Sequence, residues 1–330
     1  MAGRAHVDRV TRVPVLRVRA APKPQAHEAD CDNAPVNRAA APYRPPSDHY
    51  ENFPVASWLC PPKLRAPMAA IYWFARTADD IADEGNAAAA QRLADLSCYR
   101  QDLTAAARAQ AHSGRWPEVF DALTAMISSF QLPTDLLSDL LDAFEQDVVF
   151  TAQGRRYLND QELHDYCRRS ANPVGRLLLH LYGVRAEPAL AQSDQICTAL
   201  QLINFWQDLR GDIARARWYP SVEQMARHGV VDADLQPHAA SSQASRMVAS
   251  YAYAAWAMML RGAPLADHIP GRAGWELRLV VQGGLRILEK MAAMNHATWR
   301  QRPRLGKSDV APLLWRAWRR HYWRPAAATA

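Results

Sequence analysis

Two short acidic stretches with the same spacing constrain this chain more than any other feature of its sequence. The first holds Asp79 and Asp83, and the second holds Asp208 and Asp212. Both lie within sequence that reads as helix, where side chains four residues apart share one face. Apolar and aromatic residues surround each pair, whereas a solvated helix face has polar neighbours. The spacing therefore predicts two helices that each present a pair of carboxylates toward an apolar interior.

Two carboxylates on one helix stripe suit a divalent cation. Mg²⁺ takes one or two protein carboxylates, keeps several waters and fills its octahedron with substrate phosphate oxygens. Asn204 extends the second stripe to three oxygen ligands, because it lies four residues before Asp208. Arg76 precedes the first pair and Arg217 follows the second, so a guanidinium near each can neutralise a departing diphosphate. Either pair alone would more often be a solvated helix face, but the two together predict Mg²⁺-dependent diphosphate chemistry.

The pattern of the body is helical throughout. Helices are expected over 62–85, 88–112, 134–151, 160–181 with an interruption at Asn172-Pro173, 188–212, 241–262, 273–302 and 308–323. No run in the body shows the sustained alternation of a strand. The chain has 330 residues, of which 49% are hydrophobic, enough for one large domain. These observations predict an all-α fold for a single domain over residues 47–324.

The two ends of the chain differ from the body in composition and charge. Residues 1–46 are rich in Pro, Ala and Arg and hold seven of the 22 prolines, which predicts a disordered arm, with a transit peptide as the alternative. Residues 325–330 are expected to form a disordered tail. Residues 1–45 and 300–324 carry net charges of +4 and +7 within a total of +6, which leaves −5 on the body. An acidic body argues against a nucleic-acid partner.

The C-terminal stretch interleaves aromatic side chains with arginines. The aromatic residues are Trp299, Trp315, Trp318, Tyr322 and Trp323. This mixture suits the interface of an anionic membrane. The alternative is a last helix that packs its tryptophans on the body and leaves its arginines in solvent. No uninterrupted apolar run of about 18 residues occurs, so we expect a cytoplasmic protein, with peripheral contact at the inner face of the membrane left open.

The five cysteines are widely scattered and form no Cys-x-x-Cys arrangement. They are Cys31, Cys60, Cys98, Cys167 and Cys197. This usage predicts free thiols in a reducing compartment.

The aspartate motifs and several longer phrases resemble the squalene/phytoene synthase family, over about residues 47–320. The motifs are Arg76-x-x-Asp79-Asp80-x-x-Asp83, Asn204-x-x-x-Asp208-x-x-x-Asp212 and Arg217-x-Tyr219. Phrases at 51–57, 166–175, 204–208 and 283–290 are similar to the hopanoid-pathway branch, which is represented by hydroxysqualene synthase. That branch converts presqualene diphosphate and water to hydroxysqualene and diphosphate.

The resemblance implies an isoprenoid-synthase helical bundle with a central cavity between the two aspartate helices. The implied Mg²⁺ ligands, most of them catalytic, are Asp79, Asp83, Asn204, Asp208 and Asp212. The implied substrate contacts are His49, Phe53, Arg76, Tyr166, Arg217 and the catalytic Tyr219. A carbocation formed in the cavity needs aromatic faces around it, because a ring attracts a cation without offering a nucleophile. The candidates are Phe53, Tyr72, Phe74, Tyr166, Phe205 and Tyr219.

The motif at His49 departs from the family pattern. Many relatives carry His-x-Lys-Ser-Phe, whereas this chain has His49-Tyr50-Glu51-Asn52-Phe53. Loss of the lysine removes a cation from the neighbourhood of a diphosphate, which favours an enzyme that handles one ready-made diphosphate. No Gly-x-Gly-x-x-Gly fingerprint is visible, so no NADPH is expected. The alternatives are a full squalene or phytoene synthase that condenses two prenyl diphosphates, and a non-catalytic helical assembly factor, which would be expected to have lost the aspartates.

Overall fold

The computed structural model describes residues 60–269 and 271–319, and every regular element in this part of the chain is a helix. The elements are α1 (Pro62–Asp83), α2 (Ala89–Ala107), α3 (Pro117–Phe130), α4 (Thr134–Gln153), α5 (Asp160–Ser170), α6 (Asn172–Leu181), α7 (Glu187–Gln207), α8 (Leu209–Ala214), α9 (Val222–His228), the 3₁₀ helix η2 (Asp232–Leu235), α10 (Ser242–Gly262), α11 (Leu265–His268), α12 (Gly271–Ala293) and α13 (Lys307–Arg319). The all-α prediction is confirmed. The predicted arm and tail, His49 and Phe53 lie outside the described residues.

Local sequence signals explain where many of these helices start and stop. Prolines occupy the first turn of α1, α3, α6 and α7, where a missing N–H costs nothing. The Asn159 side chain accepts a hydrogen bond from the Glu162 N–H at 2.9 Å and caps α5. Gly154 ends α4 with a φ of 60°, a left-handed conformation that glycine adopts without strain.

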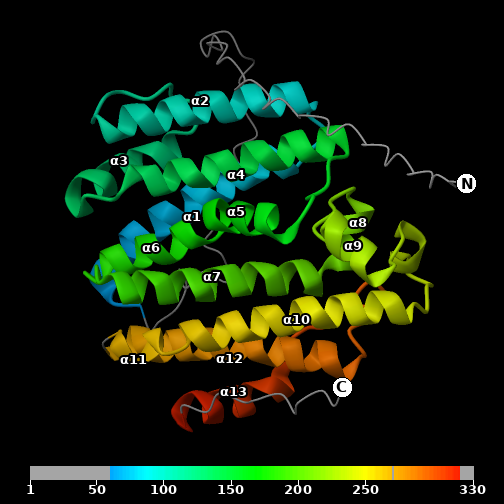
Figure 1. Cartoon of the computed structure of the whole chain (residues 1–330). Helices are drawn as coiled ribbons and strands as arrows, with labels where there is room; N and C mark the ends of the chain where they lie inside the picture. The colour runs from blue at the N-terminus through cyan, green and yellow to red at the C-terminus, as the bar shows by residue number, and fades with distance from the viewer. Residues whose placement is uncertain (1–59, 270, 320–330) are drawn as a thin grey trace, which may run out of the picture.

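The long helices lie side by side in a stack that runs from α2 at one edge to α13 at the other (Figure 1). Two large hydrophobic clusters fill this stack, and a minor third one groups Cys60, Leu64 and Met68. The smaller of the two large clusters is formed mainly by α1 to α4, and the larger one mainly by α5, α7, α10 and α12. Helix α6 joins them, because Leu177 packs in the smaller cluster and Leu179 in the larger one. The ends of α1, α4 and α7 meet the segment after α8.

Two predicted helices end early, and α3 and the short helices α9, η2 and α11 were not predicted. Helices α2 and α12 stop before the expected ends at residues 112 and 302. Ala109 and Asn295 each have a φ of 53°, which a right-handed helix cannot accommodate. Helix α3 lies between Gly114, which marks the end of one expected helix, and Thr134, which marks the start of the next, so the sequence signals indicate only a connection over this stretch. None of the described helices combines the length and apolar character needed to cross a bilayer.

The prediction of free thiols is confirmed at three of the four described cysteines and wrong at Cys98, whereas Cys31 lies outside the described residues. Cys60, Cys167 and Cys197 are free, but Cys98 is disulfide-bonded. Scattered spacing along the sequence did not reveal this, because it carries no information on which cysteines meet in space.

Candidate active site

The first aspartate motif occupies the last turns of α1. Asp79 and Asp83 lie one turn apart, and Asp83 is the final residue of the helix. The C-terminal end of a helix carries a partial negative charge from its unpaired carbonyls, which favours a nearby cation. A cation at this motif would therefore be attracted by the carboxylates and by the helix dipole together.

Arg76, predicted to steer the diphosphate, is engaged by acidic residues of its own helix end. Its guanidinium lies 2.8 Å from the Asp80 carboxylate, 3.0 Å from Glu84 and 3.8 Å from Asp79. Burial raises the pKa of Asp80 to about 6, and Arg76 only partly offsets this rise. The predicted diphosphate contact of Arg76 remains a prediction.

The second motif sits at a break between two helices rather than on one continuous helix. Asp208 separates α7 from α8, with φ −105° and ψ 17°. Gly211 leaves room for its carboxylate, because a Cβ there would stand 2.9 Å from Asp208 Oδ1. The Asp208 N–H still donates to the Asn204 carbonyl at 2.9 Å, and the Asp212 N–H to the Asp208 carbonyl at 3.0 Å. These hydrogen bonds continue across the break, so the three predicted ligand residues stay on successive turns.

Arg217 joins the two motifs. Its guanidinium forms an ion pair with the Asp83 carboxylate, and its backbone N–H donates to the Asp212 carbonyl at 2.8 Å. Both partners of the ion pair are largely buried, with about a fifth of each side chain exposed (18% and 22%). Residues far apart in the sequence, predicted separately as a metal ligand and a diphosphate contact, therefore touch.

A second arginine near the second motif was missed in the sequence. Arg302 lies 3.3 Å from the Asp208 carboxylate, in the segment between α12 and α13. Gln207 Nε2 donates to the Pro303 carbonyl at 2.7 Å and fixes this segment against the end of α7. Nothing in the sequence distinguishes Arg302 from the other basic residues of the C-terminal stretch.

Asp147 is a partly buried carboxylate that sequence reasoning also missed. It lies on α4 and accepts a hydrogen bond of 2.6 Å from the Tyr166 hydroxyl. Burial raises the pKa of Asp147 to about 7, and the charges of Asp79 and Asp212 add to the rise. Asp147 is thus within electrostatic reach of both aspartate motifs.

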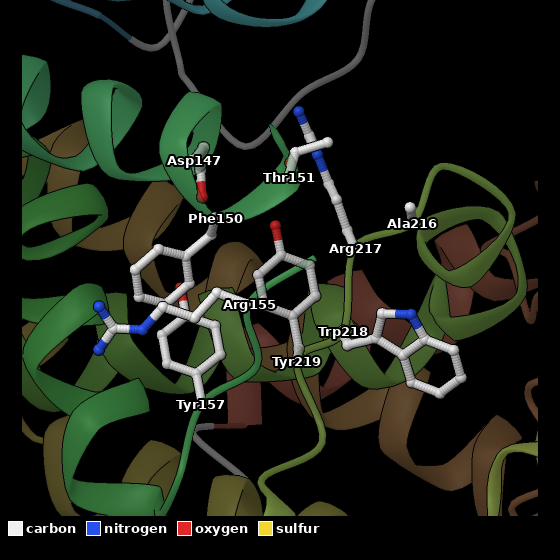
Figure 2. Close-up of a pocket in the computed structure, with 9 residues that line it drawn as sticks. All are labelled: Asp147, Phe150, Thr151, Arg155, Tyr157, Ala216, Arg217, Trp218 and Tyr219. Carbon is white, nitrogen blue, oxygen red and sulfur yellow. The ribbon is translucent and has the colours of Figure 1, made fainter. Parts of the chain in front are cut away.

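A pocket opens between the C-terminal half of α4 and the segment after α8. Its lining consists of Asp147, Phe150, Thr151, Arg155, Tyr157, Ala216, Arg217, Trp218 and Tyr219. Figure 2 shows the Tyr219 ring between Phe150 and the Arg217 side chain, with its hydroxyl directed to the same side as the guanidinium. The pocket therefore combines a carboxylate, a guanidinium and aromatic rings.

Four buried aromatic rings form a cluster at this pocket, and two of them, Tyr157 and Tyr219, belong to its lining. The rings of Phe205 and Tyr219 stack with centroids 3.6 Å apart and an interplanar angle of 11°. Tyr157 lies 6.2 Å and Tyr166 6.3 Å from the Tyr219 centroid. Tyr166, Phe205 and Tyr219 were predicted to line the cavity, whereas Tyr157 was not. Ring faces beside carboxylates make a site that attracts cations.

Two further aromatic candidates, Phe74 and Tyr72, lie elsewhere. Phe74 is fully buried in the smaller cluster, with its ring 5.2 Å from Tyr99 and 6.2 Å from Phe120. Its assignment to the cavity is wrong, because it points from α1 toward α2 and α3. The Tyr72 ring is 5.2 Å from Trp73 and is not part of the four-ring cluster.

The predicted Mg²⁺ ligands have suitable chemistry for a hard cation. No three His, Cys, Asp or Glu side chains of the described part gather closely enough to hold one ion by themselves, so the site remains a prediction. Burial and the neighbouring Asp208 carboxylate raise the pKa of Asp212 to about 7, against the opposing charges of Arg215 and Arg302. This crowding of negative charge is what a cation would relieve, and its oxygen donors are of the kind that Mg²⁺ prefers.

Comparisons with known proteins identify relatives of one family. The sequence profile described as squalene/phytoene synthase matches residues 47–309. A hydroxysqualene synthase from Sinorhizobium fredii is 34% identical over 80% of this chain and 86% of its own length. A presqualene diphosphate synthase from Rhodopseudomonas palustris is 27% identical over 80% of this chain and 91% of its own. The crystal structure of squalene synthase HpnC from Alicyclobacillus acidocaldarius superposes with a TM-score of 0.67 and 32% identity, over 75% of this chain and 90% of that one.

Proposed function

This chain belongs to the squalene/phytoene synthase family of isoprenoid enzymes, and we propose that it converts presqualene diphosphate and water to hydroxysqualene and diphosphate. The observation that carries this proposal is the ion pair between Arg217 and Asp83, which gathers both aspartate motifs beside the buried aromatic cluster. The similarity to a hydroxysqualene synthase supports the choice of reaction within the family.

The proposed diphosphate site lies between the two motifs. Arg217 and Arg302 are the cations that border it, and each already lies against a carboxylate of the motifs. Mg²⁺ would be held by Asp79, Asp83, Asn204, Asp208 and Asp212. When bound, it would neutralise charge on the leaving diphosphate. The chain contributes its own guanidinium groups to the same end.

The reaction begins when the C–O bond to the diphosphate breaks and the electron pair leaves with the diphosphate. The carbon skeleton is then a cation, which the faces of Tyr157, Tyr166, Phe205 and Tyr219 stabilise without reacting with it. These rings are buried, so they also keep bulk water away until the skeleton has rearranged.

Water ends the reaction. Its oxygen bonds to carbon, and its proton passes to Asp147, the carboxylate that lines the pocket. A carboxylate with a pKa near neutrality is well suited to accept a proton in this way. The Tyr166 hydroxyl bonds one oxygen of Asp147 and leaves the other for the water. Water, rather than a hydride, adds to the carbocation, so the reaction consumes no NADPH.

The decisive experiment offers the two kinds of substrate separately. Purified protein with Mg²⁺ and without NADPH receives presqualene diphosphate in one reaction and farnesyl diphosphate in the other, and mass spectrometry identifies the products. We expect hydroxysqualene from the first and no coupling in the second. Coupled products from farnesyl diphosphate would assign a full synthase instead, and absence of turnover with either substrate would contradict the proposal.

A matched pair of variants connects the activity to the site. Arg217→Gln removes the guanidinium between the motifs and should lower hydroxysqualene formation by ~100-fold or more, as for other groups that stabilise transition-state charge. Arg227→Gln removes an arginine of α9 whose partner, Glu223 at 2.8 Å, is exposed, and should leave the rate unchanged. Equal rates in the two variants would separate the activity from this site.

A further inference from the structure

Helix α13 docks on the molecule through charges rather than through apolar side chains. Asp309 is 1% exposed, and its carboxylate lies 2.8 Å from Arg286 and 2.8 Å from Lys290 of α12. It also accepts a hydrogen bond of 2.7 Å from the Gly306 N–H. These partners hold the pKa of Asp309 well below its ordinary range, so the group stays ionised. The first turn of α13 is thus fixed by a buried carboxylate.

The second half of the helix is held in the same way. Arg316 lies 2.5 Å from the Glu289 carboxylate, which is also 2.7 Å from Arg286. Ala317, the residue after Arg316, is also buried. Asp309 in the first turn and Arg316 in the second half of the helix therefore both face α12.

The outer face of α13 is apolar. The exposed fractions are 53% for Val310, 44% for Leu314, 55% for Trp315 and 65% for Trp318. Their spacing of four, five and eight residues from Val310 places them on one side of the helix. The two indole rings lie 5.2 Å apart. With Leu305, this stretch holds five of the nine large exposed hydrophobic residues in the described part of the chain.

The polarity of α13 is thus the reverse of that of an ordinary surface helix, which buries its apolar stripe and exposes its charges. The alternative in which the last helix packs its tryptophans on the body is wrong for Trp315 and Trp318. Trp299 is the exception, because it is buried and its indole N–H donates to the Ala239 carbonyl at 3.2 Å. A reversed helix is stable only if something apolar meets its outer face or if its exposure is tolerated for function.

The charges around this face are all positive. Arg304, Lys307 and Arg319 are exposed along the same stretch. The Arg319 guanidinium lies 5.4 Å from the centroid of Trp315. Asp309 is the single acidic residue between 300 and 324, and it is buried beneath the helix. An apolar stripe with tryptophans and a basic rim has the chemistry of a surface that meets anionic lipid headgroups.

We propose that the outer face of α13, defined by Val310, Leu314, Trp315 and Trp318, binds the surface of an anionic lipid bilayer. No described helix lies beyond α13 at this edge of the stack (Figure 1). The basic rim selects a lipid surface over an ordinary protein partner, because it complements a sheet of negative charge rather than a mixed surface. The proposal stands on this face alone and does not depend on which reaction the site performs.

The position of the face adds a reason for its presence. Helix α13 begins at Lys307, five residues after Arg302, which lies beside Asp208. Arg210 donates to the Arg300 carbonyl at 3.0 Å, and Gln207 holds the Pro303 carbonyl. A short, tethered segment therefore separates the bilayer surface from the second aspartate motif. A bilayer on this face would lie close to the site at which an apolar substrate is handled.

Flotation of the full chain with lipid vesicles tests the proposal. Vesicles of phosphatidylcholine alone are compared with vesicles that also contain phosphatidylglycerol. We expect the protein to float with the anionic vesicles. The double variant Trp315→Ser/Trp318→Ser should bind them at least ~10-fold more weakly, because two large apolar side chains no longer enter the interface. Lys307→Glu/Arg319→Glu should reduce binding to anionic vesicles by ~5-fold or more for each cation removed.

The matched control is Tyr253→Ser, which removes an aromatic side chain of α10 that is 67% exposed outside this face. It should bind vesicles like the parent. Circular dichroism verifies that all variants remain folded, and turnover of detergent-dispersed substrate reports separately on the active site. The proposal is overturned if the parent does not float, if the tryptophan variant floats equally well, or if sedimentation shows that the variant only dissociates a dimer.

Discussion

At the scale of single residues, Asp147 illustrates how burial gives a carboxylate a chemistry that its sequence position does not reveal. Its usual pKa of 3.8 rises to about 7, chiefly because the ionised form loses water, and the bond from Tyr166 only partly compensates. Near neutral pH the group therefore exists in both protonation states, as a proton acceptor must.

Replacement of Asp147 by Asn should abolish this proton acceptor. We expect hydroxysqualene formation to fall by ~100-fold or more, the range found when a general base is removed. In the parent, activity should rise with pH around 7, and this rise should be absent from the residual activity of Asp147→Asn. Rates measured from pH 5 to pH 9 check this expectation, and an unchanged profile would assign the proton to another group.

The same substitution has a stability consequence of defined sign. A carboxyl group whose pKa is raised on folding stabilises the fold below its unfolded pKa, and this contribution disappears as pH rises through the folded pKa. The parent should lose stability between about pH 4 and pH 7 relative to Asp147→Asn, by up to ~4 kcal/mol. Urea unfolding of both proteins across this pH range measures the difference.

At the scale of elements, the break between α7 and α8 decides where the Asp208 carboxylate stands. The sequence predicted one continuous helix, because the spacing of Asn204, Asp208 and Asp212 is the same with or without a break. Gly211 is the residue that could have indicated the break. A glycine three residues after an aspartate leaves space for the carboxylate to lie over the next turn. Such a contact depends on side-chain packing, which periodicity alone does not report.

Gly211→Ala tests the importance of this space. The new Cβ would lie 2.9 Å from Asp208 Oδ1, so the carboxylate must move. Because alanine favours helix, the free energy of unfolding should change by less than ~1 kcal/mol, while the Mg²⁺ concentration for half-maximal activity rises ~10-fold. Gly283→Ala in α12 is the control, since its nearest neighbour is 3.7 Å away. A rise of equal size in both variants would refute this explanation.

At the scale of the whole molecule, the crossing of α7 and α10 holds the larger cluster together. Gly262 makes the crossing possible, because a Cβ there would stand 2.6 Å from the Gln192 carbonyl and 2.5 Å from Ile196. Helix α7 also carries Asn204 and Phe205 of the site at its other end. Helix α7 therefore contributes both to the hydrophobic core and to the candidate active site.

Gly262→Ala should push α10 away from α7. Because one of the close neighbours is backbone and cannot rotate aside, we expect a loss of ~1–3 kcal/mol in the free energy of unfolding. Chemical denaturation measures this loss, with Gly283→Ala again as the control, which should be neutral or slightly stabilising. An undiminished stability of Gly262→Ala would show that the two helices can separate at little cost.

The sequence predicted the helical architecture well and the site in part. Asp79 and Asp83 could be singled out because their spacing recurs at Asp208 and Asp212, Arg217 because it follows the second pair closely, and Tyr219 through the family resemblance. Asp147 and Arg302 could not, because each is a single charged residue whose partners lie far away in the chain. The prediction that Phe74 lines the cavity is wrong for a different reason. A phenylalanine of the core and one of the cavity cannot be told apart in the sequence until the packing is known.

The ion pair between Arg217 and Asp83 also makes ligand binding at this point an exchange rather than an addition. Any anion that takes the guanidinium must first displace a carboxylate, and any cation that takes the carboxylate must first displace a guanidinium. The two ligands therefore help each other, because each releases the partner that the other needs. A site arranged in this way retains neither ligand well by itself and discriminates in favour of a substrate that arrives with its counterion.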